Sequence, residues 1–597
     1  MLRILFASLI PAIAAQAAVE DGSALFTAHC AQCHNTTGKI DRAPAPDLLK
    51  KLSKETILAA LRTGSMKAQA AMLSPAETVA IADFLGSSES VARGSANACA
   101  SNPPIPNADG WNGWGVDLVN SRFQPADHAG LSAVDVPKLK LKWAYGFPDT
   151  FSVFGQPSVV GGRLFLGSSS GQVYSLDART GCAYWNFKAA ATVRTAVTIA
   201  PLPGGRVAAY FGDTRASVYA LDAQTGELLW KTKVEEHKMA RVTGAPKLVE
   251  NRLYVPVASG VEEMAAAQPS YACCTFRGSL VALDAQTGKQ IWKTYTIPDA
   301  PAETGRNAAG TRQFGPAGAS IWDSPTIDVK RRLIYVGTGN NYSDPVTKYS
   351  DAVIAFDMDS GSMRWVKQMT PGDTWNGGCI TPSKTGCPQK AGEDTDIGAS
   401  PILRTVNGRD MLVVGQKSGV VYGVDPGNKG EILWQTRIGR GGALGGIMWG
   451  LAADAARAYV PLSDYAGPVL DAGGGMFAVD LQDGKVAWKV PPAKPGCGGK
   501  QGCSPSQMAP ATLIPGAVFS GSMDGHLRAY ATADGSVIWD FDTLRDFPTI
   551  NGVNAHGGSL NATGPTVAGG MVFVNSGYGQ LGGMPGNVLL AFSAEGN

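Results

Sequence analysis

Three segments of the sequence are nearly superimposable: VYSLDARTGCAYW (173–185), VYALDAQTGELLW (218–230) and LVALDAQTGKQIW (280–292). In each of them an apolar strand leads into an Asp-containing turn that is closed by glycine, and a second strand ends in tryptophan. This is the pattern of a β-hairpin whose glycine takes the positive-φ position. Looser copies lie at 353–365, 421–434, 476–488 and 527–539. Together the copies predict a fold built from repeated β-sheet units.

The two ends of this region supply one further unit. Trp143, in KLKLKWAY, has no strand before it, and the strand NVLLAFS (587–593) has no tryptophan after it. Joining the two completes an eighth hairpin from both chain ends, which is how a β-propeller closes its ring. The sequence therefore predicts an all-β, eight-bladed propeller over residues 107–597.

Composition and charge agree with such a fold and exclude other classes of protein. Glycine accounts for 74 of the 597 residues, above the usual share of about 7%, and this suits strands joined by tight turns. A hydrophobic content of 44% is too high for a disordered chain. Lys+Arg number 51 and Asp+Glu 49, which gives a net charge of +2. We therefore expect no nucleic-acid partner, because such proteins usually present a strongly basic face.

The N-terminus has the pattern of an export signal. The positive start Met1–Arg3 is followed by an apolar run, Ile4–Ala15, and by an A-x-A site, which together are typical of a secretory signal peptide. We expect residues 1–18 to be removed, the mature chain to begin near Ala18 or Val19, and the protein to reside in the periplasm. The apolar run is too short for a permanent anchor and no later stretch has eighteen or more apolar residues, so we expect no integral membrane segment.

A haem site follows directly. The run Cys30-Ala31-Gln32-Cys33-His34 is a C-x-x-C-H motif, in which two thiols add to the haem vinyl groups and the histidine binds the iron. Segments 23–29, 53–63 and 75–85 have helical apolar spacing, with serines as plausible caps of the last two. We therefore expect a small all-α cytochrome c domain at 19–90, followed by a linker at 91–106.

The sixth iron ligand is expected to be a methionine between the last two helices. Met66 and Met72 both lie in that interval. Met66 follows a glycine turn and leaves room before the next helix begins, so we favour Met66 and expect Met72 to serve in packing.

Eight further cysteines suit an exported protein, in which disulfides persist. Cys273 and Cys274 are adjacent and can bridge only through a strained eight-membered ring, which is found more often at functional sites than in plain scaffolding. The other pairs that the spacing permits are Cys379 with Cys387, Cys497 with Cys503 and, over a long range, Cys99 with Cys182.

The hairpin repeats resemble the tryptophan-docking motifs of the pyrroloquinoline-quinone (PQQ) dehydrogenases, and the resemblance extends from Trp111 to the C-terminus. With the N-terminal cytochrome and the run CCTFRGSLVALDAQTG (273–288), the chain looks most like the polyvinyl-alcohol dehydrogenases among the quinohaemoprotein alcohol dehydrogenases. The resemblance implies PQQ, haem c and Ca²⁺ as cofactors.

The resemblance also implies a cofactor slot with rigid walls and with cations for the quinone and its carboxylates. A vicinal disulfide at Cys273–Cys274 would form one wall, although in methanol dehydrogenase that pair lies in an earlier blade, and Trp322 would form the opposite wall. The other positions that the resemblance assigns to the cofactor are Arg194, Gln156, Lys417, Trp449 and the turn at His556.

The family holds its calcium with a Glu, an Asn and the catalytic Asp, and such oxygen donors suit a hard cation. Asn340, in VGTGNN, matches the asparagine. Two choices stay open at the other positions, and in each the first residue is favoured: Glu262 or Glu263, and Asp396 or Asp394, with Asp373 as a third choice of acid.

The implied reaction is the oxidation of a secondary alcohol, polymeric or small, to a ketone. Asp396 takes the hydroxyl proton while Ca²⁺ and Lys417 polarise the quinone carbonyl. Electrons then pass to the haem, and from there to a soluble cytochrome or a membrane respiratory chain. Two alternatives are a quinohaemoprotein dehydrogenase for small primary or secondary alcohols, and a non-enzymatic propeller scaffold. The scaffold would need neither a haem site nor adjacent cysteines.

Overall fold

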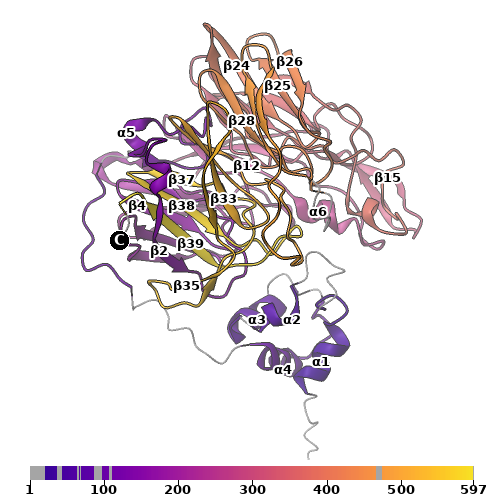
Figure 1. Cartoon of the computed structure of the whole chain (residues 1–597). Helices are drawn as coiled ribbons and strands as arrows, with labels where there is room; N and C mark the ends of the chain where they lie inside the picture. Colours follow the sequence, from indigo (N-terminus) through magenta and orange to yellow (C-terminus); the bar gives the residue numbers. More distant parts are fainter. Residues whose placement is uncertain are drawn as a thin grey trace, which may run out of the picture. The chain divides into compact units, whose positions relative to one another are not determined.

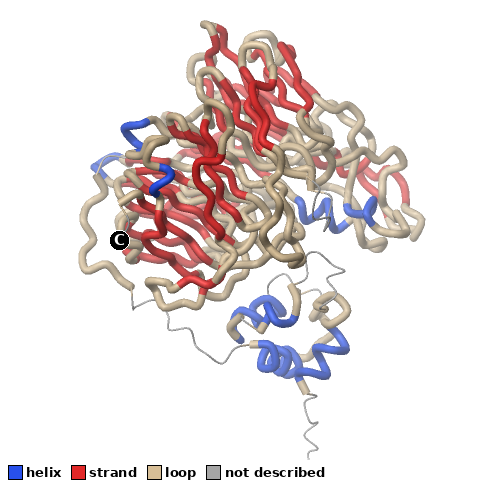
Figure 2. The backbone as a smooth tube through the Cα atoms, in the orientation of Figure 1, coloured by secondary structure: helices blue, strands red, loops and turns tan. Residues whose placement is uncertain are grey.

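The computed structural model describes residues 21–35, 44–50, 52–62, 66–67, 69–86, 97–106, 110–465 and 473–595. The expected signal peptide, 1–18, lies outside these residues. The chain divides into two compact units, Met1–Val91 and Ala92–Asn597. Helices dominate the first unit and strands the second (Figures 1 and 2). In the part of the chain described, no helix is long and apolar enough to cross a membrane.

The first unit contains the helices α1 (Gly22–His29), α2 (Pro46–Leu49), α3 (Lys54–Arg62) and α4 (Pro75–Leu85). The three longer helices confirm the predicted ones, and α4 contacts both α1 and α3. Ser74 caps α4 as expected, because its side chain accepts the Glu77 N–H at 3.2 Å while the Glu77 carboxylate accepts the Ser74 N–H at 2.6 Å. Leu25, Phe26 and Ile81 are buried between these helices.

Antiparallel sheets of four or five strands form eight blades in the described part of the second unit, as predicted. Blade 1 consists of β1 (Gly110–Trp111), β3 (Ser158–Val160), β4 (Arg163–Gly167), β5 (Gln172–Asp177) and β6 (Ala183–Lys188). Blade 2 consists of β7 (Thr198–Pro201), β8 (Val207–Gly212), β9 (Ser217–Asp222) and β10 (Leu228–Lys233), and blade 3 of β11 (Lys247–Val249), β12 (Arg252–Val257), β13 (Ser279–Asp284) and β14 (Gln290–Tyr295). Blade 4 consists of β18 (Thr326–Asp328), β19 (Leu333–Gly337), β21 (Ala352–Asp357) and β22 (Met363–Gln368).

Blade 5 consists of β23 (Ile402–Val406), β24 (Arg409–Gly415), β25 (Val420–Asp425) and β26 (Glu431–Arg437), and blade 6 of β27 (Ala452–Ala453), β28 (Arg457–Pro461), β29 (Met476–Asp480) and β30 (Val486–Val490). Blade 7 consists of β31 (Thr512–Ile514), β32 (Ala517–Gly521), β33 (His526–Ala531) and β34 (Val537–Asp542). Blade 8 consists of β37 (Thr566–Ala568), β38 (Met571–Ser576), β39 (Val588–Ser593) and β2 (Lys140–Gly146). In blade 8 the strand near the start of the unit, β2, pairs with the last strand, β39, so the ring closes between the two chain ends as predicted.

Short elements lie between the blade strands. They are the pairs β15 (Ala302–Arg306) with β16 (Arg312–Gly315), β17 (Ala317–Gly318) with β20 (Asn341–Ser343) and β35 (Asp546–Phe547) with β36 (Ala555–His556), the helices α5 (Ala126–Ala129) and α6 (Gly260–Ala265), and the 3-10 turns η1 (Val136–Lys138), η2 (Pro203–Gly205) and η3 (Gly377–Ile380).

The repeated tryptophan and glycine pack neighbouring blades together, and in seven of the eight described blades the indole N–H donates to the next blade. The indole N–H of Trp185 donates to Ala223 O at 2.9 Å, and that acceptor directly follows the turn aspartate of the next blade. A Cβ on Gly226 of the same turn would lie 2.7 Å from the Trp185 ring, so only glycine lets the indole lie flat there. The same bond links Trp143 to Ala178, Trp230 to Ala285, Trp292 to Met358, Trp434 to Leu481, Trp488 to Thr532 and Trp539 to Leu139.

The segment Trp111–Gln124, here called the crossing segment, contacts the first strand of every blade, counted in blade 1 as β3, because β1 leads into the segment itself. Its contacts, from blade 1 to blade 8, are Trp111 with Val159, Asn112 with Ile199, Asp117 with Lys247, Leu118 with Ile327, Val119 with Leu403, Ser121 with Ala453, Arg122 with Leu513 and Gln124 with Val567. Because first strands line the centre of a propeller, the segment ties the blades together at one end of the ring.

All four expected disulfides form: Cys99–Cys182, Cys273–Cys274, Cys379–Cys387 and Cys497–Cys503. The first one attaches residues 97–106, which we expected to be linker, to blade 1. Cys99 N–H also donates to Ala183 O at 3.0 Å, and Asn102 bonds to Gln224 of blade 2. This part of the expected linker is therefore fixed to the propeller.

Candidate active site

One end of the propeller carries the residues expected at the cofactor. Because neighbouring strands of a blade are antiparallel, the connection into its first strand and the connection between its second and third strands leave at the same end. The first kind of connection carries Gln156, Arg194, Trp322, Asp396, Trp449 and His556, and the second carries Glu262, Cys273, Cys274, Asn340 and Lys417. Topology alone thus gathers residues that lie up to seven blades apart in the sequence.

A lysine shared by two acids forms the centre of the site. Lys417 Nζ donates to Asp396 Oδ2 at 2.7 Å and to Asp394 Oδ1 at 3.0 Å, and all three side chains are nearly buried. Burial disfavours the charged lysine, but the carboxylates of Asp394, Asp396 and Glu263 raise the pKa of Lys417 above its ordinary value. Burial raises the pKa of Asp394 well above its ordinary value, although Lys417 lowers it. Lys417 is therefore a fixed cation.

Gly339 lets Asn340 and Trp322 come close to Asp396 of the lysine centre. Asp396 Oδ1 accepts the backbone N–H of Asn340 at 2.8 Å. A Cβ on Gly339 would lie 2.6 Å from Asp396 Oδ1 and 2.6 Å from Trp322 Nε1. The carboxylate and the indole edge therefore meet over a residue that cannot be larger than glycine without a shift.

Two buried polar atoms beside this contact have no hydrogen-bond partner in the described structure: Trp322 Nε1 and Asn340 Oδ1. The Asn340 amide is held in place because its Nδ2 donates to Trp375 O at 2.7 Å. Its oxygen is left as an acceptor near the carboxylates, which is the donor chemistry that a hard cation prefers.

The adjacent glutamates of α6 have different surroundings. Glu262 is fully buried; its Oε1 accepts the Tyr271 hydroxyl at 2.9 Å and the Thr275 N–H at 2.8 Å, and its Oε2 accepts the Phe276 N–H at 2.6 Å. Burial raises the pKa of Glu262, but the hydrogen bonds from His237 and from these two amides hold it below its ordinary value.

Glu263 belongs electrostatically to the lysine centre. Burial raises the pKa of Tyr342 well above its ordinary value, and the Glu263 charge raises it further. The same charge adds to the raised pKa values of Asp394 and Lys417. A Cβ on Gly260 would lie 3.1 Å from Trp322 Cη2 and 3.9 Å from Glu263 Oε2, so Glu263 also lies beside the expected wall residue.

The vicinal disulfide lies in the loop that Glu262 contacts. Cys273 and Cys274 are buried, and their backbone pairs with Phe314 of β16, with Cys274 N–H donating at 3.1 Å and Cys273 O accepting at 2.7 Å. The loop is thus held on one side by β16 and on the other by Glu262.

Arg194 and Trp449 form a second group. The Arg194 guanidinium lies 4.7 Å from the Trp449 ring centre and 5.6 Å from that of Phe154. Trp449 Nε1 donates to Asn561 Oδ1 at 2.7 Å. Sequence reasoning missed Phe154 and Asn561, because both lie outside the hairpin repeats and carry no motif.

Three other expected residues bond to partners other than the side chains of the lysine centre. Both ends of the Gln156 amide bond to the crossing segment, with Arg122 donating to Oε1 at 2.9 Å and Nε2 donating to Trp114 O at 2.8 Å. Asp373 accepts the Thr395 N–H at 2.7 Å and thereby holds the loop that carries Asp394 and Asp396. His556 pairs with the exposed Asp546 at 2.8 Å.

Asp351 is a buried acid that sequence reasoning missed. Neither of its oxygens has a hydrogen-bond partner in the described structure. Burial raises the pKa of Asp351 well above its ordinary value, and the charges of Asp373, Asp396 and Asp394 raise it further. It therefore belongs to the same acidic surroundings as Lys417.

The first unit presents the expected haem residues. Cys30 and Cys33 are the two cysteines outside disulfides in the described chain. His34 is nearly buried, and its Nδ1 lies 2.9 Å from Pro44 O. A backbone acceptor at Nδ1 leaves Nε2 with its lone pair for a metal, as second-sphere partners of metal-binding histidines commonly do. Met66 is half-buried, whereas Met72 is 76% exposed.

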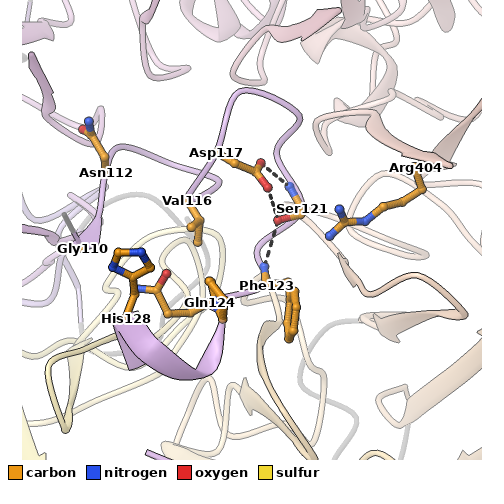
Figure 3. Close-up of a pocket in the computed structure, with 10 residues that line it drawn as sticks. Gly110, Asn112, Val116, Asp117, Ser121, Phe123, Gln124, His128 and Arg404 are labelled. Carbon is orange, nitrogen blue, oxygen red and sulfur yellow. Dashed lines mark hydrogen bonds between the residues drawn. The ribbon is translucent and has the colours of Figure 1, made fainter. Parts of the chain in front are cut away.

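A cavity of about 410 Å³ lies elsewhere, against the crossing segment (Figure 3). Asp117 there accepts hydrogen bonds from Ser121, and Arg404 points toward the same serine. Asp117, Ser121 and Arg404 contact or belong to the first strands at the centre of the ring, and none of the expected cofactor residues lines this cavity. We therefore separate it from the candidate active site.

Models of known protein families match parts of both units of the chain. The family model described as glucose/ethanol/alcohol dehydrogenase, β-propeller domain, matches residues 111–384. The model described as cytochrome c oxidase, cbb3-type, subunit III, matches residues 17–85. A third model, described as outer membrane protein assembly factor BamB, matches residues 262–585.

Similar proteins cover nearly the whole chain. A polyvinylalcohol dehydrogenase of Pseudomonas sp. is 44% identical over 98% of this chain and 95% of its own length, and one of Sphingopyxis sp. (strain 113P3) is 41% identical over 96% and 93%. The solved quinohemoprotein alcohol dehydrogenase of Comamonas testosteroni shares the fold, with a TM-score of 0.60 at 21% identity over 83% of this chain and 82% of its own. This chain therefore belongs to the polyvinylalcohol dehydrogenase family, with a PQQ-type β-propeller and an N-terminal cytochrome c-type domain.

Proposed function

We propose that this protein is an exported quinohaemoprotein dehydrogenase that oxidises secondary hydroxyl groups, such as those of polyvinyl alcohol, to ketones. PQQ with Ca²⁺ would serve in the propeller and haem c in the first unit. The observation that carries the proposal is the buried Asp396–Lys417 contact at 2.7 Å beside the unpartnered Asn340 oxygen. A base, a cation and a metal donor are thereby available within one buried group.

The donor set fits calcium. Asn340 Oδ1 is a buried acceptor without a partner in the described structure, and Glu263 and Asp396 supply carboxylates to the same group. No cluster of three His, Cys, Asp or Glu side chains suited to a metal occurs among the residues described. The Asn340 amide oxygen and the carboxylates would hold a Ca²⁺ ion together with oxygens of a bound cofactor, and such oxygen donors suit a cation with six to eight ligands.

The side chains of this group have separate roles in the proposed reaction. PQQ, when bound, supplies the two-electron acceptor for the hydride of the carbinol carbon. Asp396 acts as the general base at the substrate hydroxyl, with Lys417 and the Asn340 N–H orienting its carboxylate. Lys417 stays protonated, because Asp394, Asp396 and Glu263 raise its pKa, and so it would supply a fixed positive charge to a quinone bound beside it. Trp322 and the Cys273–Cys274 pair are the expected walls.

The haem domain is proposed to relay the electrons. Haem c, when bound, supplies a one-electron carrier on Cys30 and Cys33. His34 would bind the iron through Nε2, since Nδ1 faces Pro44 O. The half-buried Met66 is favoured over the exposed Met72 as the second axial ligand. Tethering a one-electron carrier to a two-electron site raises its effective concentration there.

The substrate assignment rests on the relatives that are named for polyvinyl alcohol. Residues 1–18 favour export to the periplasm, where a soluble cytochrome or a membrane respiratory chain would accept the electrons. The runner-up is a dehydrogenase for small alcohols.

The test is dye reduction by the holoenzyme with polyvinyl alcohol, a small secondary alcohol and a small primary alcohol. Turnover should require PQQ and Ca²⁺. It should also convert the haem iron to its reduced state, which the absorption spectrum of the haem shows. Asp396→Asn should lower kcat at least 100-fold, because general-base catalysis contributes about 10²–10⁴-fold, and should leave PQQ bound. Full activity of that variant would refute the assignment of the base, and faster turnover of the primary alcohol would favour the runner-up.

A further inference from the structure

We propose that Glu262 is a positioning residue that fixes the vicinal-disulfide wall of the cofactor slot, and that the metal-side carboxylate of α6 is Glu263. This rests on the proposed function, because it assumes that PQQ binds between Trp322 and the Cys273–Cys274 pair. It reverses the expectation from the sequence, which favoured Glu262 as the calcium ligand.

The contacts of Glu262 reach both sides of the disulfide. Tyr271, two residues before Cys273, donates its hydroxyl at 2.9 Å. Thr275 and Phe276, directly after Cys274, donate their backbone N–H groups at 2.8 Å and 2.6 Å. The Thr275 hydroxyl adds a longer bond at 3.3 Å. One carboxylate therefore holds the chain before and after the two cysteines.

These donors leave Glu262 little capacity for a cation. A carboxylate offers about four lone-pair sites, and four donors already point at this one. His237 Nε2 lies 3.6 Å from Oε1 as well. Three of the donors converge on Oε1 and the Phe276 N–H reaches Oε2, so a calcium ion at either oxygen would approach N–H or O–H groups whose positive ends repel it.

The helix explains why neighbouring glutamates diverge. Successive residues of an α-helix point about 100° apart, and α6 spans Gly260–Ala265. Ser259 caps the helix by accepting the Glu262 N–H at 3.2 Å, which fixes the rotation of the helix. Glu262 then faces the disulfide loop, whereas Glu263 lies near Trp322 and the Lys417 centre.

The opposite side of the disulfide loop is anchored independently. Phe314 of β16 makes two backbone hydrogen bonds to the cysteines, at 2.7 Å and 3.1 Å. With Glu262 in place, the loop cannot shift toward or away from the slot. Without it, two backbone N–H groups lose a charged acceptor, and the wall keeps only the β16 side of its support.

Matched variants distinguish the two glutamates. In Glu262→Gln the amide NH₂ opposes one of the donors, and the remaining donors lose their charged acceptor. We expect the Kd of the apoenzyme for PQQ, measured by quenching of tryptophan fluorescence at saturating Ca²⁺, to rise at least 10-fold. The Ca²⁺ concentration for half-maximal binding should stay unchanged. In Glu263→Gln we expect the reverse: a Ca²⁺ requirement raised at least 10-fold, with normal PQQ affinity once Ca²⁺ saturates.

A second readout needs no cofactor. The rate at which a phosphine reductant opens the Cys273–Cys274 bond in the apoenzyme, followed by thiol labelling and mass spectrometry, should rise in Glu262→Gln and not in Glu263→Gln. Tyr271→Phe removes a single donor and should shift both readouts in the direction of Glu262→Gln by a smaller factor. It therefore provides the test if Glu262→Gln does not fold.

Rescue of PQQ binding in Glu262→Gln by excess Ca²⁺ would overturn the proposal, and so would unchanged PQQ affinity in both Glu262→Gln and Tyr271→Phe. If Glu263→Gln leaves the Ca²⁺ requirement unchanged while Glu262→Gln behaves as expected, the calcium assignment to Glu263 fails and the positioning role of Glu262 stands.

Discussion

At the scale of single residues, Gly339 controls how closely Asp396 and Trp322, the proposed base and the proposed wall, approach each other. A Cβ there would lie 2.6 Å from both Asp396 Oδ1 and Trp322 Nε1, and real Cβ atoms do not come so close to other heavy atoms. We expect Gly339→Ala to lower kcat/KM at least 10-fold, because it displaces the base or the wall by a few tenths of an ångström. Steady-state dye reduction measures this. Gly427→Ala, in an exposed turn of blade 5, is the control and should keep full activity.

Motifs located some site residues but could not assign roles to all of them. Asn340 and Lys417 lie in short runs whose spacing to the following strand fixes their end of the blade, so the sequence predicts their position. Glu262 and Gln156 carry the right functional groups, yet their partners come from segments such as 271–276 and the crossing segment, which approach only in the folded ring. Which of two adjacent acids faces a site depends on such contacts.

At the scale of elements, the tryptophan hairpins contain a natural comparison. Trp434 Nε1 donates to Leu481 O at 2.9 Å, whereas the buried Trp365 Nε1 has no partner in the described structure. The residue that corresponds to Leu481 is Pro426, in a turn one residue longer than in the other blades. We expect Trp434→Phe to lower the free energy of unfolding by about 1 kcal/mol more than Trp365→Phe does, because only Trp434 loses a hydrogen bond. Thermal unfolding of the two variants tests this, and equal losses would contradict it.

The hairpin β33–β34 should make stability depend on pH. His526 Nδ1 lies 2.7 Å from Asp540, with 20% of the histidine side chain exposed, and this hydrogen bond raises the pKa of His526 although burial lowers it. A raised pKa in the folded state means that the stabilisation is complete below the unfolded value of about 6.5 and is lost as pH rises through the folded value.

His526→Gln should therefore lower the free energy of unfolding more at pH 5.5 than at pH 8.5, and the difference should be up to about 1 kcal/mol for a partly exposed pair. Thermal unfolding at the two pH values measures this. A larger loss of stability at pH 8.5 than at pH 5.5 would contradict the raised pKa of His526 in the folded protein.

The elements that were predicted share a local signal. Seven hairpins and the helices α1, α3 and α4 follow from apolar spacing and capping residues within about fifteen residues of sequence. The β15–β16 hairpin and the attachment of residues 97–106 have no such signal, because their partners are the vicinal cysteines and the outer strand of blade 1. Pairings with distant segments are set by the assembled ring.

At the scale of the whole molecule, the number of blades was predictable and the way they are held at the centre was not. The count follows from repeats, and closure follows from the unpaired Trp143 strand. The crossing segment has no repeat and no periodicity, yet its residues reach the first strand of each blade. Single hydrogen bonds to eight different strands leave no pattern along one stretch of sequence.

Arg122 is the residue through which this segment should control the stability of the ring. It is 1% exposed, and its guanidinium donates to Ala511 O at 2.6 Å, to Trp114 O at 2.7 Å, to Gln156 Oε1 at 2.9 Å and to Thr512 Oγ1 at 3.0 Å. These bonds connect the crossing segment with blades 1 and 7. Burial lowers the pKa of Arg122 to about 9, so its hydrogen bonds must compensate for a buried charge.

Arg122→Met should therefore destabilise the propeller by about 3 kcal/mol or more, since it leaves several buried acceptors without a donor. Because those acceptors lie in different blades, we expect the second unit to melt at a lower temperature as a whole, while the haem band of the first unit keeps its own transition. Calorimetry combined with haem absorbance separates the two. Arg179→Met, in the exposed turn after β5, is the matched control, and an equal loss in both variants would show that the crossing segment does not hold the ring together.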